Sequence, residues 1–332
     1  MSQSQQERER VLSGIQPTGE LQLGNYFGAV KHWVALQDRY HCFYPIVDYH
    51  AITVDYEPEQ LKKNTLGMAI DLMASGIDPK RSVLFVQSQV PEHTELAWVF
   101  NSVASYGDLT RMTQFKEKSE GAAFVSAGLF IYPILQAADI LIYKASKVPV
   151  GEDQVQHLEL SRRIARRFNR QFGELFPEPE ALLSEAPRIM STADPSKKMS
   201  KSLGSKHYIG VMESEDVIWE KIKTAVTDVG LEAAGEQKSP GVDNLFVLLR
   251  LTADARTVEK FEQEYANGKL LYQRLKEAVY EHLMATLKPI RERHRELEAD
   301  LPGVQRILQD GAQRAREIAV RTMAEVRERI GV

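Results

Sequence analysis

The chain has 332 residues, which is long enough for one large domain and a smaller one. Its 42 Lys and Arg against 46 Asp and Glu give a net charge of −4, so no global basic character indicates nucleic-acid binding, and any such function has to be argued from motifs. The single cysteine, Cys42, excludes an internal disulfide and a multi-thiolate zinc or iron–sulfur site, and it fits a reducing cytoplasm.

Two segments of the first 150 residues were candidates for a signal peptide or a membrane span, and neither has the required composition. The amino terminus, MSQSQQERER, is polar and charged, so we expect no signal peptide. Only residues 125–143 approach the length of a membrane span. Because Pro133, Gln136 and Asp139 lie within them, we predict a loop followed by a buried helix, and no membrane segment.

Short apolar runs rich in β-forming residues alternate with helical patterns through the first 190 residues. The runs are Val11–Ile15, Cys42–Val47, Val83–Val86, Val148–Val150 and Ile189–Met190. This alternation predicts βαβ units and an α/β fold with a doubly wound parallel (Rossmann-type) sheet covered by helices.

Helical patterns occupy the stretches between and after these runs. Apolar spacing predicts a first crossover helix from about Gly24 to Arg39, and residues from about 91 to 120 have the pattern of an inserted helical segment. From about residue 205 the strand signals end, and helices are expected at Asp216–Thr227, Leu270–Leu287 and Val304–Ile330.

Turn and loop signals complete this outline. Pro289 and Pro302 mark breaks or helix starts, and Glu232–Gly241 has the composition of an exposed loop. We therefore predict a parallel-sheet domain over residues 1–204 and an all-helical domain over residues 205–332, whose last helix is a candidate to pack back on the first domain.

The turn after the first strand is rich in glycine. It reads GIQPTGELQLGNY, with Gly14, Gly19 and Gly24 ahead of the first helix. Glycines and a helix amino terminus allow backbone N–H groups to approach a phosphate. The turn lacks the spacing of the dinucleotide fingerprint and the Walker lysine, so taken alone it fits an ordinary strand-to-helix turn better.

The segment DPSKKMSKSLGS at 194–205 is a second candidate. Lys197, Lys198 and Lys201 lie in a stretch too irregular for a packed helix. Clustered cations on such a loop can surround a polyphosphate as its charge shifts in a transition state. A solvated linker is the alternative, as for any run of charge.

Together, these two segments resemble the paired signatures of class I aminoacyl-tRNA synthetases: KMSKS at 198–202, and PTGELQLGN at 17–25 as a divergent nucleotide turn. Further strings are similar to those of bacterial tryptophanyl-tRNA synthetases. They are IVDYHAIT (46–53), GIDP (76–79), RMTQFKEKS (111–119), YPILQAADIL (132–141), VPVGEDQVQHLEL (148–160) and KIKTAVTD (221–228). Beyond about residue 232 the resemblance rests on length and helical character.

The resemblance implies an ATP-dependent ligase. Such an enzyme converts L-tryptophan and ATP to tryptophanyl-adenylate and pyrophosphate, then transfers tryptophan to tRNA(Trp). The substrate carboxylate is already ionised, so catalysis consists of in-line positioning and charge stabilisation. Mg²⁺ would arrive with the nucleotide, without a dedicated metal site or a prosthetic group. The resemblance also implies a cytoplasmic homodimer whose helical domain reads the anticodon.

Roles for individual residues follow from the same resemblance. Lys198 and Lys201 would clamp the leaving pyrophosphate, and Lys118 would add a further cation. The residues implied to bind ATP are Gln16, Pro17, Thr18, Gly24, Asn25, Gly151, Glu152, Asp153, Ile189, Lys198, Met199, Ser200, Lys201 and Ser202. The residues implied to bind tryptophan are Asp139, Gln136, His50, Gln154, Val148 and Val150.

Asp139 stands out because an ionised carboxylate is costly to bury without partners, and its neighbours in LFIYPILQAADILIY (129–143) are apolar. Pro133 suits the first turn of a helix, which places Gln136 and Asp139 on one face. The resemblance implies that Asp139 accepts the indole N–H, so that a substrate without this donor leaves it unpaired. Without the surrounding motifs, a structural Arg partner would be expected instead.

Two alternatives stay open at this point. Tyrosyl-tRNA synthetase has a similar fold and a Gln-Ala-x-Asp helix like that of Gln136 and Asp139, although GEDQ at 151–154 and Leu12 favour the tryptophanyl form. An inactive, RNA-binding relative would be expected to lose residues such as Lys198.

Gln22 stands where the class signature has its first His. An amide can donate a hydrogen bond to a phosphate but carries no charge.

Three histidines show no metal-ligand spacing. They are His50, His93 and His157, and each is expected to be a satisfied helix or loop histidine, with His50 near the pocket by its motif.

Overall fold

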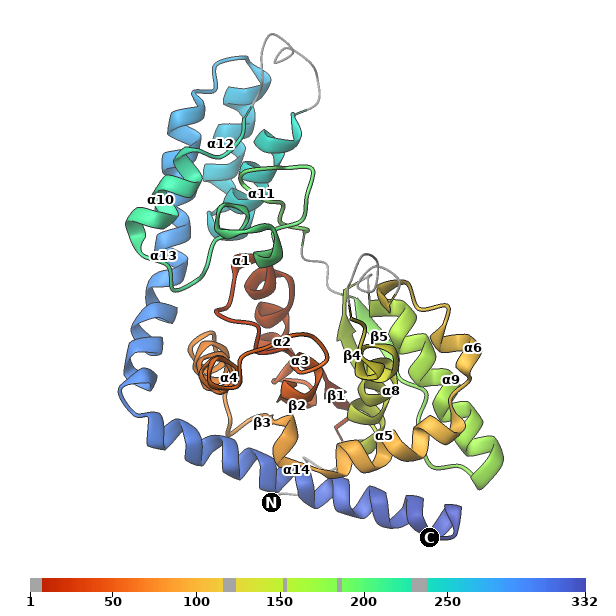
Figure 1. The fold of residues 1–332 in the computed structure, drawn as a ribbon. Helices are drawn as coiled ribbons and strands as arrows, with labels where there is room; N and C mark the ends of the chain where they lie inside the picture. The colour runs from red at the N-terminus through yellow and green to blue at the C-terminus, as the bar shows by residue number, and fades with distance from the viewer. Residues whose placement is uncertain (1–7, 116–123, 152–153, 184–186, 228–237) are drawn as a thin grey trace. The chain divides into compact units, whose positions relative to one another are not determined.

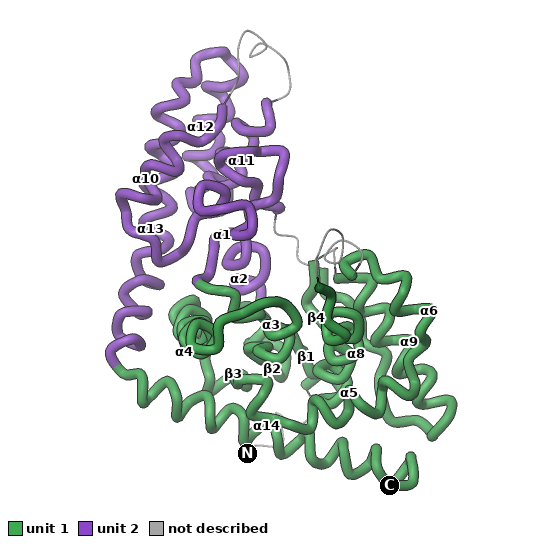
Figure 2. The backbone as a smooth tube through the Cα atoms, viewed as in Figure 1, with its two compact units in different colours: residues 1–19, 33–184, 300–332 green, residues 20–32, 185–299 purple. Residues whose placement is uncertain are grey.

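The computed structural model describes residues 8–115, 124–151, 154–183, 187–227 and 238–332 (Figure 1). The chain forms two compact units, which are coloured separately in Figure 2. Unit 1 consists of residues 1–19, 33–184 and 300–332, and unit 2 of residues 20–32 and 185–299.

Unit 1 is built on a five-stranded parallel sheet in the order β3-β2-β1-β4-β5. The strands are β1 (Arg10–Leu12), β2 (His41–Ile46), β3 (Val83–Val86), β4 (Lys147–Val150) and β5 (Glu180–Leu183). All four residues of β3 are buried, as expected for a parallel strand covered on both faces. The predicted Rossmann-type parallel sheet is therefore confirmed.

One prediction at the edge of this sheet was wrong, and one strand was missed. Ile189–Met190 is not a strand of the sheet: Met190 forms an isolated antiparallel bridge with Lys198, and both residues belong to unit 2. The fifth strand is β5, which sequence reasoning missed. Its side chains are largely exposed, so it carries no apolar signal, and its pairing with β4 depends on the backbone.

Helices cover the sheet in unit 1. They are α3 (Asp48–Ala51), α4 (Pro58–Ala74), α5 (Glu92–Val103), α6 (Tyr106–Leu109), α8 (Ala127–Ile142), α9 (Val155–Phe172) and α14 (Leu301–Ile330), with a 3-10 turn η3 (Gln87–Gln89). The first crossover consists of α1 (Leu23–Asn25), a π-helical stretch (Tyr26–Val30) and α2 (Lys31–Leu36). A single hydrophobic cluster joins the sheet to α5, α8, α9 and α14.

Helix α8 is the buried helix expected within residues 125–143. Ser126 caps its amino terminus by accepting a hydrogen bond from the Leu129 N–H. Because the helix already begins at Ala127, Pro133 lies in its interior, and the prediction of Pro133 in the first turn was wrong. No helix among the described residues is long and apolar enough to cross a membrane.

Helix α14 belongs to unit 1, although it closes the chain. It packs on β3, where Gly311 lies against the backbone carbonyl of Leu84 and the Cβ of Phe85. Small residues at Ala312 and Ala315 continue this close approach. Compactness thus groups α14 with the sheet, and the functional division between residues 204 and 205 stays a prediction.

Unit 2 is mostly helical. Its longer helices are α10 (Glu215–Lys223), α11 (Pro240–Thr252), α12 (Ala255–Ala266) and α13 (Tyr272–Glu298), and two 3-10 turns span Lys201–Leu203 and Ser205–His207. Pro289 lies inside α13 and does not break it, whereas Pro302 stands at the start of α14, as expected. Residues 228–237, which include most of the loop expected at Glu232–Gly241, lie outside the described residues.

We predict that Gly311→Ala destabilises the protein by at least about 2 kcal/mol, because its Cβ would collide with the Leu84 carbonyl oxygen. Gly67→Ala on α4 is the matched control. A Cβ there meets no atom within 4 Å, so the gain in helix propensity should stabilise by about 0.5–1 kcal/mol. Urea unfolding of both variants measures the difference, and equal effects would contradict the close packing of α14 on β3.

Candidate active site

Asp139 lies at the centre of a buried hydrogen-bonded cluster in unit 1, and its side chain is almost fully buried. Its Oδ1 accepts hydrogen bonds from Gln87 Nε2 at 2.7 Å and from His93 Nδ1 at 2.6 Å. Its Oδ2 accepts one from His50 Nε2 at 2.8 Å. The partners of this carboxylate in the described chain are thus two histidines and an amide, and not the arginine considered from sequence.

These hydrogen bonds decide the charge of Asp139. Burial raises the pKa of its carboxyl group, but the hydrogen bonds from His50 and His93 lower it more, to about 2. Asp139 is therefore ionised at neutral pH and can only accept hydrogen bonds. The apparent conflict between a carboxylate and its apolar sequence neighbours is resolved by donors from other elements.

The cluster extends beyond Asp139 to residues that no motif identified. His93, on α5, is fully buried, and its Nε2 lies 2.6 Å from the Tyr143 hydroxyl. Gln87, in η3, accepts a hydrogen bond from the Tyr49 N–H at 3.1 Å. His93 is thus a satisfied histidine, as expected, and its partners are Asp139 and Tyr143.

The other residues implied to bind tryptophan also belong to unit 1. Gln136 Nε2 lies 3.5 Å from Gln154 Oε1. Val148 is buried on β4 and Val150 is half-buried at its end. The structure therefore joins His50 to Asp139 and Gln136 to Gln154.

The lysine-rich signature segment lies in unit 2 and is held by backbone hydrogen bonds. Met199 N donates to the Ile189 carbonyl at 3.1 Å, and Ser191 N donates to the Lys197 carbonyl at 2.8 Å. These bonds bury Ile189 and Met199 and leave Lys198 exposed. Lys198 therefore lies on a backbone segment that is held by this short antiparallel pairing.

The second part of the glycine-bearing turn, from Glu20 onward, belongs to unit 2 and is bonded to this segment. Gln22 Nε2 donates to the Met199 carbonyl at 3.3 Å, and Lys201 Nζ donates to the Glu20 carbonyl at 2.9 Å. The backbone carbonyl of Gln22 accepts from the N–H groups of Asn25 and Tyr26. The two signatures are therefore contiguous, and the amide nitrogen of Gln22 is engaged by protein backbone.

The remaining residues implied to bind ATP are distributed as follows. Gln16, Pro17 and Thr18 follow β1 in unit 1, where Thr18 N donates to the Gln16 carbonyl at 2.9 Å. Gly151 follows β4, and Gly24, Asn25, Ser200 and Ser202 belong to unit 2. Lys118, Glu152 and Asp153 lie outside the described residues.

Asn244, on α11, is a supporting residue that sequence reasoning missed. Its side chain accepts from Met190 N at 2.9 Å and donates to the Met190 carbonyl at 3.0 Å. It is buried within the apolar run VDNLFVLL. Asp139 was identified as a polar side chain within an apolar run. The same pattern at Asn244 could have indicated a buried side chain that holds a neighbouring backbone segment.

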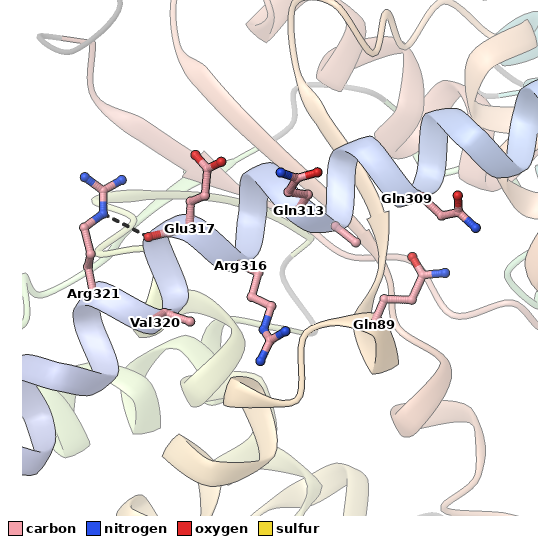
Figure 3. Close-up of a pocket in the computed structure, with 8 residues that line it drawn as sticks. Gln89, Gln309, Gln313, Arg316, Glu317, Val320 and Arg321 are labelled. Atoms are coloured by element: carbon pink, nitrogen blue, oxygen red, sulfur yellow. Dashed lines mark hydrogen bonds between the residues drawn. The ribbon is translucent and has the colours of Figure 1, made fainter.

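Neither a metal-binding cluster nor a large open pocket coincides with the predicted site residues among the described ones. No group of three or more His, Cys, Asp or Glu side chains that could hold a metal ion occurs within the described ranges. An open pocket of about 890 Å³ lies along α14 (Figure 3), and none of its lining residues is a predicted site residue. They are Gln89, Gln309, Ala312, Gln313, Arg316, Glu317, Val320 and Arg321.

Comparison with known proteins places the chain in a family. The family model for class I tRNA synthetases (W and Y) matches residues 4–288. The chain belongs to this family. Among relatives of this synthetase, the tryptophan–tRNA ligase of Caldanaerobacter subterraneus subsp. tengcongensis is 46% identical over 327 residues, which cover 98% of each chain. That of Helicobacter pylori is 45% identical over 328 residues, covering 98% of this chain and 99% of the relative.

Solved structures agree with the sequence relatives. The tryptophanyl-tRNA synthetase of Campylobacter jejuni, complexed with ADP and tryptophan, matches this synthetase with a TM-score of 0.86 and 37% identity, covering 97% of this chain and 100% of that one. The tyrosyl-tRNA synthetase of Archaeoglobus fulgidus matches with a TM-score of 0.68 and 20% identity, over 87% and 91% of the two chains. The second likeness shows a shared fold alone.

We predict that Asn244→Ala loosens the signature segment, because it removes both hydrogen bonds that hold the Met190 backbone. Amide exchange at Met190 and Ser191 should become at least about tenfold faster, as expected for the loss of one or two net hydrogen bonds. Asn267→Ala, at an exposed residue after α12, is the control and should leave these amides unchanged. Unchanged exchange in the Asn244 variant would show that this anchor is not needed.

Proposed function

We propose that this chain is an ATP-dependent, AMP-forming tryptophan–tRNA ligase. It activates L-tryptophan with ATP to give tryptophanyl-adenylate and pyrophosphate, and it then transfers tryptophan to tRNA(Trp). The tryptophan–tRNA ligases that are about 46% identical over nearly its whole length support this proposal. The observation that carries it is Asp139, a buried ionised acceptor on the helix assigned to the amino-acid pocket.

Recognition of the amino acid follows from the chemistry of Asp139. Its carboxylate cannot donate a hydrogen bond, so it selects a ligand that presents a donor, an N–H or an O–H. The indole N–H of tryptophan is such a group, whereas phenylalanine has no polar hydrogen to offer. A substrate without the donor would leave a buried charge with one partner fewer, and this penalty discriminates strongly.

Activation requires in-line attack of the tryptophan carboxylate on the α-phosphorus, with pyrophosphate as the leaving group. Lys198 and Lys201 of the signature segment supply positive charge for the phosphate oxygens as charge builds up there. Gly24 and Asn25, whose backbone is joined to this segment through Gln22, would hold the nucleotide. Lys118 and the ribose contacts at Glu152 and Asp153 remain part of this proposal, and Mg²⁺ would accompany ATP through its phosphates.

The broader setting of the enzyme is also proposed. A homodimer is supported by the aromatic side chains of Trp98 and Tyr106, which are 78% and 74% exposed near one another in the chain. We assign anticodon reading to the helices after residue 205, by the family resemblance. A cytoplasmic location fits the buried, unpaired thiol of Cys42.

Two other functions have less support. A tyrosyl enzyme is disfavoured because the relatives at about 46% identity are named tryptophan–tRNA ligases. An inactive relative is disfavoured because Asp139, Lys198 and Lys201 are all present, with Asp139 ionised and Lys198 exposed.

ATP–pyrophosphate exchange without tRNA tests the function directly. Exchange should depend on added tryptophan, and phenylalanine, which has no donor for Asp139, should give a rate at least about 10³-fold lower, since discrimination by a buried hydrogen-bonding group reaches this size. Tyrosine is measured alongside, because its hydroxyl can donate to a carboxylate. Exchange with tyrosine alone would assign the pocket to a phenol. Exchange with neither amino acid, in a folded chain that binds tRNA, would support the inactive relative.

Lys198→Ala should lower the rate of adenylate formation about 100-fold, because the charge that Lys198 meets develops in the transition state. The affinity for tryptophan should change little, since Asp139 and its partners belong to unit 1. Lys206→Ala, another exposed lysine of unit 2, is the control. Single-turnover kinetics measure both variants, and an unchanged rate for Lys198→Ala would refute its assignment.

A further inference from the structure

We propose that His93, held in place by Tyr143, is a positioning residue for tryptophan selection. This inference rests on the proposed function. His93 occupies Oδ1 of Asp139 and thereby reserves the free acceptor position of Oδ2 for the indole N–H. His93 itself touches Asp139 and Tyr143, and acts on the substrate through Asp139.

His93 lies between Asp139 and Tyr143, and the proton on its Nδ1 can be assigned. Asp139 is ionised, so the proton between it and His93 is carried by Nδ1. Burial raises the pKa of Tyr143 well above its usual value, so its hydroxyl keeps its proton. With Nδ1 directed to Asp139, Nε2 of His93 faces the Tyr143 hydroxyl, 2.6 Å away.

The two carboxylate oxygens of Asp139 are unequally occupied. Oδ1 receives Gln87 and His93, at 2.7 and 2.6 Å, which fills its two lone-pair directions. Within the described chain, Oδ2 receives His50 alone, at 2.8 Å. The remaining acceptor position is therefore on Oδ2. A rotation of the carboxylate about its Cβ–Cγ bond would move this acceptor position away from the substrate.

The packing around Tyr143 makes this arrangement rigid. The Tyr143 ring stacks on Phe43 of β2, with centroids 4.6 Å apart and planes at 17°. Its edge also meets Phe85 of β3. All three rings are fully buried, so the hydroxyl that orients His93 is fixed by the sheet itself.

The pair His93→Asn and His93→Gln separates positioning from packing. The amide nitrogen of Asn can replace Nδ1 and still donate to Asp139, whereas that of Gln extends toward the position of Nε2 and Tyr143. Discrimination is measured in the full-length enzyme as the ratio of kcat/KM in ATP–pyrophosphate exchange for tryptophan and for 3-benzothienylalanine, in which sulfur replaces the indole N–H. The KM for ATP is measured alongside it.

We expect His93→Asn to keep the tryptophan preference within about threefold of wild type, and His93→Gln to lose about tenfold or more of it, as for a charge-assisted hydrogen bond. The KM for ATP should stay the same in both. Equal preference in the two variants, whether kept or lost, would overturn the positioning role. A loss that appears equally in the KM for ATP would also overturn it.

Tyr143→Phe provides an independent measurement if the His93→Gln variant does not fold, because it keeps the stacked ring and removes the hydroxyl alone. The tryptophan preference should fall at least about threefold, and an unchanged preference would overturn the inference. ATP–pyrophosphate exchange of the wild-type enzyme with tryptophan separates failure of the positioning role from failure of the proposed function. If it occurs and the variants fail the expectation, the positioning role alone is wrong; if it does not occur, the proposed function and the inference both fall.

Discussion

The structure depends on the burial of one ionised carboxylate. Moving Asp139 out of water without partners would cost several kcal/mol, so its donors have to be supplied with good geometry. His50 stands on α3, directly after β2, and Gln87 stands in η3, directly after β3. Adjacent parallel strands place both donors at the same edge of the sheet, where ligands bind in open α/β folds. Sheet topology and site chemistry are therefore one constraint.

Sequence reasoning predicts the parts of the fold whose signal lies within a short window. Val83–Val86 was predicted with its observed bounds, because a fully buried parallel strand is a continuous apolar run. The strand β5 was not, because its side chains are exposed and its pairing is made by backbone groups that every residue has. Pro133 was misplaced for a related reason: the helix start is set by the Ser126 cap, and apolar spacing alone does not show where α8 begins.

The site divides in the same way. Asp139, Lys198 and Lys201 were identified from sequence because each is conspicuous in its own segment or matches a signature. His93, Tyr143 and Asn244 were not, since each acts through a contact with a residue 46 to 54 positions away in the chain. A buried polar side chain tells the reader that a partner must exist. Only the tertiary structure shows which partner it is.

Asn244 and Asp139 are both buried polar side chains, and they differ in how many of their hydrogen-bonding positions the protein fills. Asn244 uses its amide nitrogen and its carbonyl oxygen on the backbone of Met190, as expected of a structural group. Asp139 has three donors for about four acceptor positions, so it is stable enough to stay ionised and still has capacity for one ligand. A fourth protein donor would make the carboxylate purely structural. With fewer donors its pKa would rise, and the site would lose the charge that makes an N–H donor preferable to an apolar edge.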